Sequence, residues 1–152
     1  MIVDLQRLDP EGERLTGAEP GDVLDVHEEG VETGEPVRYR LDVRRVTDEL
    51  LVRGVVEAKV EFVCSRCAKR FRRRVADEAF ERAIPVEGRE TVDLTADIRE
   101  AILLSFPNYP LCRADCRGLC PQCGASRNRG PCGCRAAHDG EEWKALDGLH
   151  LE

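Results

Sequence analysis

The chain has 152 residues, of which 41% are hydrophobic and 35% are charged, and its formal net charge at pH 7 is −7. This length allows one ordinary domain with a small appendage, but not two full-sized domains. The longest apolar run, AILL at residues 101–104, is far too short to span a bilayer. Because the N-terminus also lacks the basic start and apolar core of a signal peptide, we expect a soluble cytoplasmic protein.

The first half of the sequence has the pattern of β-strands. After a short first strand, IVDLQRL, residues 9–36 are rich in glycine, proline and acidic side chains, which indicates turns or a loose loop. From Val37 the sequence VRYRLDVRR alternates apolar and charged residues, and LVRGVVEAKVEFV at 51–63 repeats this alternation. CSRC and the β-like RFRRRV follow, so the pattern predicts a hairpin with Cys64 and Cys67 at its tip.

The segment TVDLTADIREAILLSFP at residues 91–107 changes from a strand period to a helical one. Thr95 is placed to cap a helix and Pro107 to end it. One face of this helix would carry Ile98, Ala101, Ile102 and Ser105. We expect this face to pack across the sheet, which predicts an α+β fold with an antiparallel β-sheet body and one packed helix.

These patterns divide the chain into three regions. The β-rich α+β body is expected over residues 1–107, a small cysteine-rich zinc-binding module over 108–136, and an acidic tail with a short helix over 137–152. Apolar residues at helical spacing in the tail are expected to dock on the body or, alternatively, to bind a partner. They are Trp143, Leu146 and Leu149.

The eight cysteines favour metal ligation, because close cysteine pairs in a reducing compartment are poor candidates for disulfides. CPQCG at residues 120–124 has the features of a metal knuckle, since Pro121 favours the turn and Gly124 tolerates a left-handed conformation. A further C-x-C pair follows in GPCGC at residues 130–134, among residues that favour tight turns. Four thiolates would close a tetrahedral site, so we expect a structural zinc ion held by Cys120, Cys123, Cys132 and Cys134.

A second zinc site, also structural, would pin the hairpin tip to the start of the module. Its ligands would be Cys64, Cys67, Cys112 and Cys116. Two features count against this grouping: C-x-x-x-C is a loose spacing, and Ala68 stands where a knuckle prefers glycine, at a cost of roughly 1 kcal/mol if it is left-handed. A different partition, in which Cys116 joins Cys120 and Cys123, stays open.

Residues 66–74, RCAKRFRRR, carry six positive charges in an otherwise acidic chain. A basic stripe beside a metal knuckle is suited to phosphate, and base stacking would be limited mainly to Phe71 and Tyr109. The residues expected to contact RNA are Arg66, Lys69, Arg70, Arg72, Arg73 and Arg74. Two other interpretations stay open: arginines elsewhere in the cysteine module compensate the charge of the thiolates, and the hairpin arginines pack against the acidic N-terminal segment.

We find no P-loop, dinucleotide-binding glycine fingerprint, nucleophile elbow or metalloprotease helix motif in the sequence, and expect no enzymatic activity. Two alternative functions remain. A zinc–thiolate redox switch is one, since a C-x-C and a C-x-x-C that share zinc are typical of redox-regulated chaperones. The other is a protein-interaction module with structural zinc, whose tail and acidic segments bind a basic partner protein.

Four motifs occur in a specific order: CSRC, VDLTADIREAILLSFP, PLCRADCRGLCPQCG and NRGPCGC. In this order the chain resembles the bacterial YceD family, whose members are named large ribosomal RNA subunit accumulation proteins. The resemblance is strongest over residues 50–135. By this resemblance, Cys64 and Cys67 belong to the pattern that the family shares most widely, and the run from Cys112 to Cys134 is typical of part of the family.

The resemblance implies a non-enzymatic ribosome-biogenesis factor that supports accumulation of large-subunit ribosomal RNA. Its implied partners are precursor RNA or an assembling ribosomal protein, with no membrane and no small-molecule substrate. Family members often have a gene neighbour that encodes a large-subunit ribosomal protein, which points in the same direction.

Overall fold

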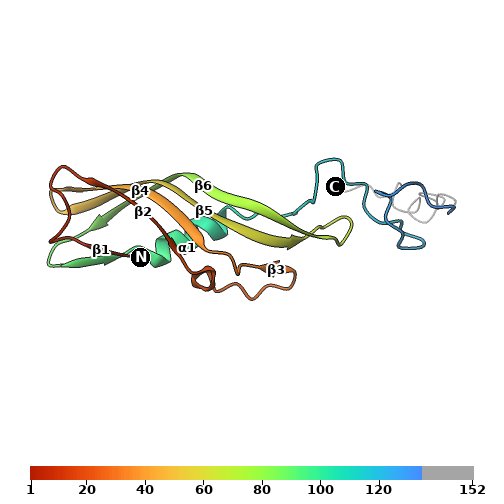
Figure 1. Ribbon diagram of the computed structural model, residues 1–152, viewed down its shortest axis with the longest axis horizontal. Coiled ribbons are helices and arrows are strands. Elements are labelled where there is room, and N and C mark those ends of the chain that lie inside the picture. Colours follow the sequence, from red (N-terminus) through yellow and green to blue (C-terminus); the bar gives the residue numbers. More distant parts are fainter. Residues whose placement is uncertain (135–152) are drawn as a thin grey trace, which may run out of the picture.

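The computed structural model describes residues 1–134, which contain a five-stranded antiparallel sheet, a two-stranded sheet and one α-helix (Figure 1). The strands of the larger sheet are β2 (Glu13–Glu19), β3 (Val31–Glu32), β4 (Val37–Val46), β5 (Glu49–Val63) and β6 (Arg70–Pro85). The smaller sheet pairs β1 (Ile2–Asp4) with β7 (Thr91–Asp93). The helices are the 3-10 helix η1 (Gly21–Leu24) and α1 (Thr95–Leu104).

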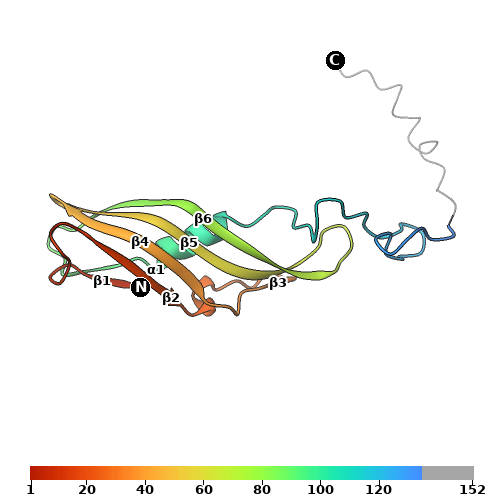
Figure 2. The ribbon, with the colours of Figure 1, turned by 45° about the horizontal axis from the view of Figure 1, so that its top comes forward.

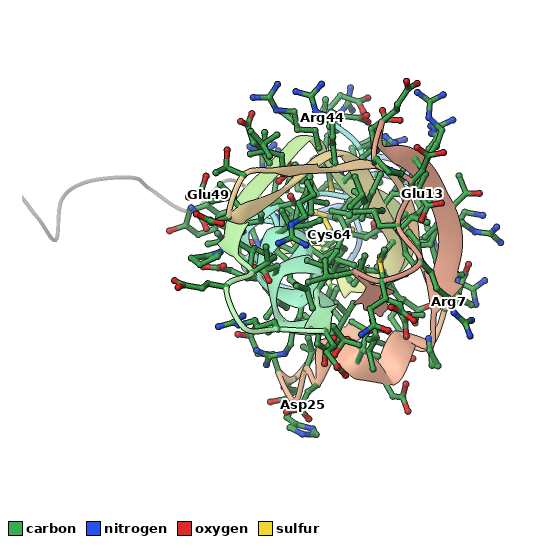
Figure 3. The ribbon with its side chains drawn as sticks, turned by 90° about the vertical axis from the view of Figure 1, so that its left-hand side faces the viewer. Arg7, Glu13, Asp25, Arg44, Glu49 and Cys64 are labelled. Atoms are coloured by element: carbon green, nitrogen blue, oxygen red, sulfur yellow. The ribbon has the colours of Figure 1, made fainter. Side chains whose placement is uncertain are left out.

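Strand β5 is the centre of the larger sheet. It pairs with β6 along nearly its whole length, while β4 and the short β3 pair with it on the other side. The helix α1 lies across one face of the twisted sheet, and the chain after α1 runs toward the β5–β6 turn and beyond it (Figures 1 and 2). In a view along the long axis, Arg44 and Glu49 lie at the periphery and Cys64 lies near the axis (Figure 3).

The predicted alternation of the two long strands is confirmed, because every second side chain enters the core. The buried residues of β4 and β5 include Val37, Leu41, Val43, Val52, Val56, Ala58, Val60 and Phe62. At the end of this row, Phe62 contacts the edge of Phe106 with ring centroids 5.4 Å apart. This aromatic pair fixes the chain that leaves α1 against the sheet.

A β-bulge interrupts the pairing of β5 with β6 between Gly54 and Val56. Gly54 has φ of 154°, and a Cβ atom at this position would lie 2.1 Å from the carbonyl oxygen of Arg40 on β4. Directly opposite on β6 is Phe80, which is only 1% exposed. Glycine is therefore required here, because β4 and β5 approach each other too closely for a side chain.

Helix α1 begins where the sequence predicts, but Thr95 does not cap it, because Leu94 occupies the cap position. The carboxylate of Asp93 accepts hydrogen bonds from the backbone N–H of Thr95 at 2.9 Å and from its hydroxyl at 2.6 Å. Thr95 is the first helical residue and not the cap, so that prediction was wrong. The predicted face is confirmed, with Ile98, Ala101 and Ile102 buried and Ser105 half-buried. The helix ends at Leu104, shortly before Pro107.

Residues 9–36 are not the loose loop that their composition predicts. They contain β2, which pairs with β4 along its whole length, as well as η1 and β3. The sequence ERLTGAE of β2 is too polar to signal a strand, and it becomes one because it is an edge strand whose hydrogen bonds come from β4. Arg14 of β2 adds an exposed ion pair with Asp42 of β4, with an N–O distance of 2.7 Å.

The predicted fold class is confirmed: an antiparallel sheet carries one packed helix, followed by a cysteine-rich segment without strands or helices as far as residue 134. The helix predicted in the tail, with Trp143, Leu146 and Leu149, lies outside the described residues. Within residues 1–134, no helix is both long and apolar enough to cross a membrane.

Candidate metal centres

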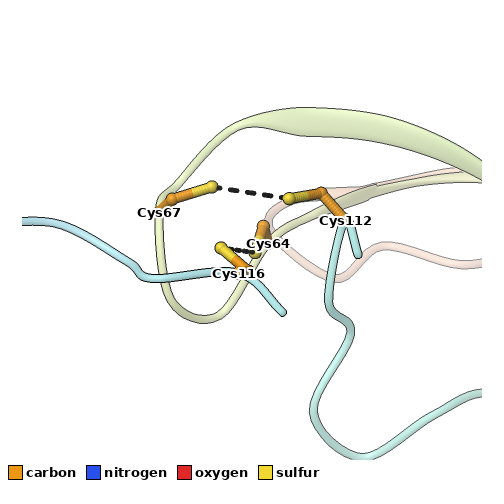
Figure 4. A group of neighbouring side chains, drawn as sticks. All are labelled: Cys64, Cys67, Cys112 and Cys116. Carbon is orange, nitrogen blue, oxygen red and sulfur yellow. Dashed lines mark hydrogen bonds between the residues drawn. The ribbon is translucent and has the colours of Figure 1, made fainter. Parts of the chain in front are cut away.

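Four cysteines from two distant parts of the chain meet at the β5–β6 turn (Figure 4). This first cluster consists of Cys64, Cys67, Cys112 and Cys116. Cys64 directly follows β5, and both Cys64 and Cys116 are 2% exposed. All four Sγ atoms lie within 4.8 Å of one another. The cluster therefore joins the hairpin tip to the segment after α1.

The sulfur–sulfur distances of the first cluster fit a zinc site and exclude disulfides. The Sγ atoms of Cys64 and Cys116 are 3.8 Å apart, and those of Cys67 and Cys112 are 3.7 Å apart. A tetrahedron with Zn–S bonds of about 2.3 Å has edges of about 3.8 Å. A disulfide would bring the sulfurs to about 2.05 Å. Four thiol donors complete a tetrahedral coordination sphere and are thus able to hold a structural metal ion.

A second cluster lies within the cysteine-rich module, and its Sγ atoms also lie within 4.8 Å of one another. It consists of Cys120, Cys123, Cys132 and Cys134. The turn around the first two has knuckle geometry, since the N–H of Gly124 donates to the carbonyl oxygen of Cys120 at 2.9 Å and Gly124 has φ of 70°. The alternative partition is not the arrangement found, because Cys116 lies in the first cluster.

In the first cluster, one thiol ionises easily and another holds its proton. Burial raises the pKa of Cys64, but hydrogen bonds from the backbone N–H groups of Cys112, Arg66 and Cys67 outweigh burial and bring that pKa down to about 6. Burial and hydrogen bonds with the neighbouring thiols raise the pKa of Cys112 to about 12. Because several adjacent thiolates repel one another, complete ionisation requires a cation between them.

The second cluster also combines one thiol of lowered pKa with one of raised pKa. Backbone N–H groups of Cys123 and Gln122 lower the pKa of Cys120 to about 6. A hydrogen bond with the Cys123 thiol, followed by burial, raises the pKa of Cys134 to about 12. A divalent ion would supply the charge that lets all four thiols of each cluster ionise, so both donor sets fit zinc.

The two C-x-x-C turns differ at the residue after the second cysteine. Ala68 and Gly124 both have left-handed φ, 54° and 70°, and each donates its N–H to the carbonyl of the first cysteine at 2.9 Å. A side chain in this conformation costs roughly 1 kcal/mol. We therefore expect Ala68→Gly to raise the zinc affinity of the first cluster up to about fivefold, and Gly124→Ala to lower that of the second cluster similarly. Chelator competition measures both, and changes of the same sign would contradict this explanation.

Asn128 connects the two clusters. It lies in the loop between Cys123 and Cys132, and its Nδ2 donates to the Sγ of Cys116 at 3.3 Å. Its Oδ1 accepts from the backbone N–H of Arg117 at 2.8 Å and from Nη2 of Arg113 at 2.9 Å. The hydrogen bond from Asn128 is the main reason that the pKa of the Cys116 thiol is lowered. Folding of the second cluster thus positions a group that orients a thiol of the first.

Replacing Asn128 by alanine should lower the zinc affinity of the first cluster by about tenfold, because hydrogen-bond partners of metal ligands typically have effects of this size. The second cluster should keep its affinity, since the asparagine contacts none of its thiols. Chelator competition with the two sites resolved is the measurement. Ser126→Ala in the same loop is the control, and equal losses in both variants would show that Asn128 has no special role.

The chain is similar to known bacterial proteins along most of its length. The profile of the large ribosomal RNA subunit accumulation protein YceD matches residues 76–150. An uncharacterized protein of Mycobacterium tuberculosis (strain ATCC 25618 / H37Rv) is 32% identical over 151 residues, covering 82% of this chain and 69% of that protein. The chain belongs to the YceD family.

Another relative matches over a shorter stretch. An uncharacterized protein of Mycobacterium leprae (strain TN) is 32% identical over 113 residues, which cover 63% of this chain and 51% of that protein. No solved structure matches the sequence. The YceD profile covers α1 and six of the eight cysteines but begins after Cys64 and Cys67, so the wide sharing of that pair stays a prediction.

The six basic residues predicted to contact RNA have different surroundings in the structure. The Arg66 guanidinium donates to the Cys116 carbonyl at 3.0 Å, and the Arg66 carbonyl accepts from Leu119 N–H at 3.1 Å, so Arg66 ties the tip to the module. Three arginines of β6, Arg70, Arg72 and Arg74, form exposed ion pairs with Glu32, Glu35, Glu57, Glu61 and Glu78. Within residues 1–134, Lys69 and Arg73 form no ion pair.

A hollow of about 480 Å³ separates β6 from the segment that enters the first cluster, and Cys112 is part of its wall. It gathers three arginines and the two aromatic residues that the sequence singled out for stacking, namely Arg72, Arg73, Arg113, Phe71 and Tyr109. Tyr109 is 81% exposed, whereas Phe71 is half-buried against Phe62. The sequence did not reveal this juxtaposition, because Arg113 and Tyr109 come from a segment distant from β6.

Proposed function

We propose that this YceD-family protein is a non-enzymatic ribosome-biogenesis factor that supports accumulation of large-subunit ribosomal RNA by binding this RNA or its precursor. The family is named for accumulation of the large ribosomal RNA subunit. The proposed activity belongs in the cytoplasm, where bacterial ribosomes assemble. The observation that carries the proposal is the hollow beside the first cluster, which three arginines and the exposed Tyr109 line together.

This arrangement suits single-stranded or looped RNA. Proteins bind unpaired RNA by combining arginine contacts to phosphates with stacking of bases on exposed aromatic rings. Tyr109 offers the ring, and Arg73 offers a guanidinium without an acidic partner among residues 1–134. In the module, three further arginines form no ion pair within the same residues and would extend the basic surface, namely Arg117, Arg127 and Arg129.

We further propose that each cluster holds one zinc ion and that the role of zinc is structural. Cys112 lines the hollow, and Tyr109 lies just before it, so the first cluster would hold the stacking residue against β6. Four thiolates leave no coordination position for water or substrate, so the metal would position the surface and would not act on RNA. Zinc would therefore support RNA binding indirectly.

A variant that carries both Tyr109→Ala and Arg73→Glu tests the RNA surface. It should bind a large-subunit ribosomal RNA transcript at least about tenfold more weakly, because stacking contributes about 1–3 kcal/mol per base and the charge reversal repels phosphate. Zinc content and thermal unfolding should stay unchanged, since both side chains are exposed. Filter binding at fixed salt concentration with the zinc-loaded full chain measures the affinity.

The matched control is Arg44→Glu, which makes the same change of charge near the β4–β5 turn, at the end of the sheet opposite the β5–β6 turn. This control should lose little affinity. If it loses as much as the double variant, the attraction is a general effect of charge and not of this hollow. If the double variant binds RNA as well as the unaltered protein, the proposed RNA surface is wrong.

A further inference from the structure

A second hollow lies beside the same segment after α1. It measures about 670 Å³ and is bounded by the loop before β3, the C-terminal end of α1 and the residues that follow. Apolar side chains form much of its lining, including Val26, Val31, Phe62, Leu103, Leu104 and Phe106. Leu104 is 77% exposed although it is a large hydrophobic residue of a helix. We call this hollow the apolar groove.

The rim of the apolar groove is acidic. Asp25 projects from the periphery of the body (Figure 3), and its carboxylate lies 2.9 Å from Nε2 of His27. Glu28 and Glu29 also line the groove, and neither takes part in an ion pair within residues 1–134. The arginine of the lining, Arg99, donates its Nε to the Leu24 carbonyl at 2.9 Å and so is held at one edge.

These charges discriminate between possible occupants. RNA is disfavoured, because Glu28 and Glu29 would repel its phosphates. The protein's own tail is disfavoured for the same reason, since residues 137–152 carry five acidic residues against one lysine. A basic peptide complements the rim, and one large apolar side chain of that peptide would cover Leu104 and fill the space above Phe106.

We propose that the apolar groove binds a lysine- and arginine-rich segment of a partner protein that inserts one large apolar side chain. This inference goes beyond the proposed function, because it requires no contact with RNA. Neighbouring residues of one segment line both hollows. Tyr109 lines the hollow beside the first cluster, and Asn108 and Pro110 line the apolar groove. The protein would thus hold a basic protein segment and an RNA side by side.

The first experiment titrates the full zinc-loaded chain with a short fluorescent peptide of lysines and arginines that has one central leucine. We expect saturable binding, with amide shifts in NMR spectra confined to the residues around Val26, Val31 and Leu104. The same peptide with serine in place of leucine should bind about tenfold more weakly, because it loses the burial of one large apolar side chain. Equal binding of both peptides, or shifts elsewhere on the protein, would overturn the proposal.

Two variants test the groove from the side of the protein. Glu28→Gln combined with Glu29→Gln, and separately Leu104→Ser, should each weaken binding of the leucine peptide about fivefold to tenfold. The control combines Asp48→Asn with Glu49→Gln at the far end of the sheet, which removes the same charge from another exposed site. A loss in the control equal to that in the Glu28 and Glu29 variant would reduce the binding to general attraction and overturn the proposal.

Two further measurements separate this proposal from its rivals. Trp143→Ser in the full chain should leave the groove resonances unchanged without peptide, and a change there would identify the tail as the occupant instead. The Glu28 and Glu29 variant should bind the RNA transcript normally, and loss of RNA binding would show that the groove takes RNA. The Tyr109 and Arg73 variant should still bind the peptide, so the groove and the RNA surface can fail independently.

Discussion

Replacing Cys116 by serine should reduce the zinc content from two ions per chain to one and release the cysteine-rich module from the hairpin tip. A serine hydroxyl is a poor zinc ligand, and its substitution removes one of four donors. Loss of a hydrogen-bond partner of a ligand already lowers metal affinity about tenfold to a hundredfold, so loss of a ligand should exceed a hundredfold.

Few direct contacts would hold the module to the tip without the first metal. Ser65 N–H donates to the Pro110 carbonyl at 2.9 Å, Arg66 forms hydrogen bonds with Cys116 and Leu119, and the Cys112 N–H donates to the Cys64 thiol. Each contributes about 1 kcal/mol net, whereas ordering each residue of the connecting segment costs about 1–2 kcal/mol. These hydrogen bonds are therefore too weak to replace the metal.

Native mass spectrometry and hydrogen exchange measure this effect together. In Cys116→Ser, amides of residues 108–119 should lose protection while those of β4 and β5 keep it, because the core of the sheet does not depend on the module. Cys132→Ser is the matched control, which should also leave one zinc ion but keep residues 108–116 protected. Retention of two zinc ions in Cys116→Ser, or unfolding of the whole sheet, would contradict this account.

Replacing Gly54 by alanine should lower the free energy of unfolding of the sheet by about 3 kcal/mol or more. The added Cβ would lie 2.1 Å from the Arg40 carbonyl oxygen and 2.9 Å from the Leu41 Cα. Both obstacles are backbone atoms of β4, so relief requires the central strands to separate. Urea unfolding followed by circular dichroism measures the loss.

Gly34→Ala is the control for this prediction, because nothing lies within 4 Å of a Cβ at Gly34. Both substitutions remove the same freedom of glycine from the unfolded chain, so their difference reports the contact in the folded state. We expect Gly34→Ala to change the unfolding free energy by no more than about 0.5 kcal/mol. Similar stability of the two variants would mean that β4 and β5 are not this close.

The sequence predicts the long strands and the helix because their side chains follow simple periods. Alternation from Val37 to Phe62 reports one buried and one exposed face, and the spacing of Ile98, Ala101 and Ile102 reports a helix packed on the sheet. These signals are local, since each depends only on which face of an element meets the core.

Strands that form only by pairing with an adjacent strand were not predictable from periodicity. β2 is a strand because β4 offers its edge, and β3 is two residues that pair with Phe62 and Glu61. Thr95 has a residue type suited to the cap position, but Leu94 occupies that position and Thr95 is the first helical residue. The sequence does not display the backbone conformation at Leu94 that decides this.

The cysteine groups show the same limit. Spacing identified CPQCG as a knuckle, but spacing cannot pair Cys64 with Cys116 across 52 positions, so two partitions stayed open. The role of Asn128 and the ion pairs of the β6 arginines depend on contacts between distant segments. The number of positive charges in the sequence suggested that all the arginines of β6 could contact RNA. Three of them form ion pairs with glutamates instead.

Ultraviolet cross-linking in the host cell tests most directly whether this tip contacts ribosomal RNA. The protein is purified under denaturing conditions, the attached RNA is sequenced, and the cross-linked peptides are identified by mass spectrometry. We predict a sharp footprint on large-subunit ribosomal RNA, attached through peptides that contain Tyr109 or residues 69–74. Absence of cross-linked RNA at normal expression, or attachment only through other parts of the chain, would contradict the claim that this tip contacts ribosomal RNA.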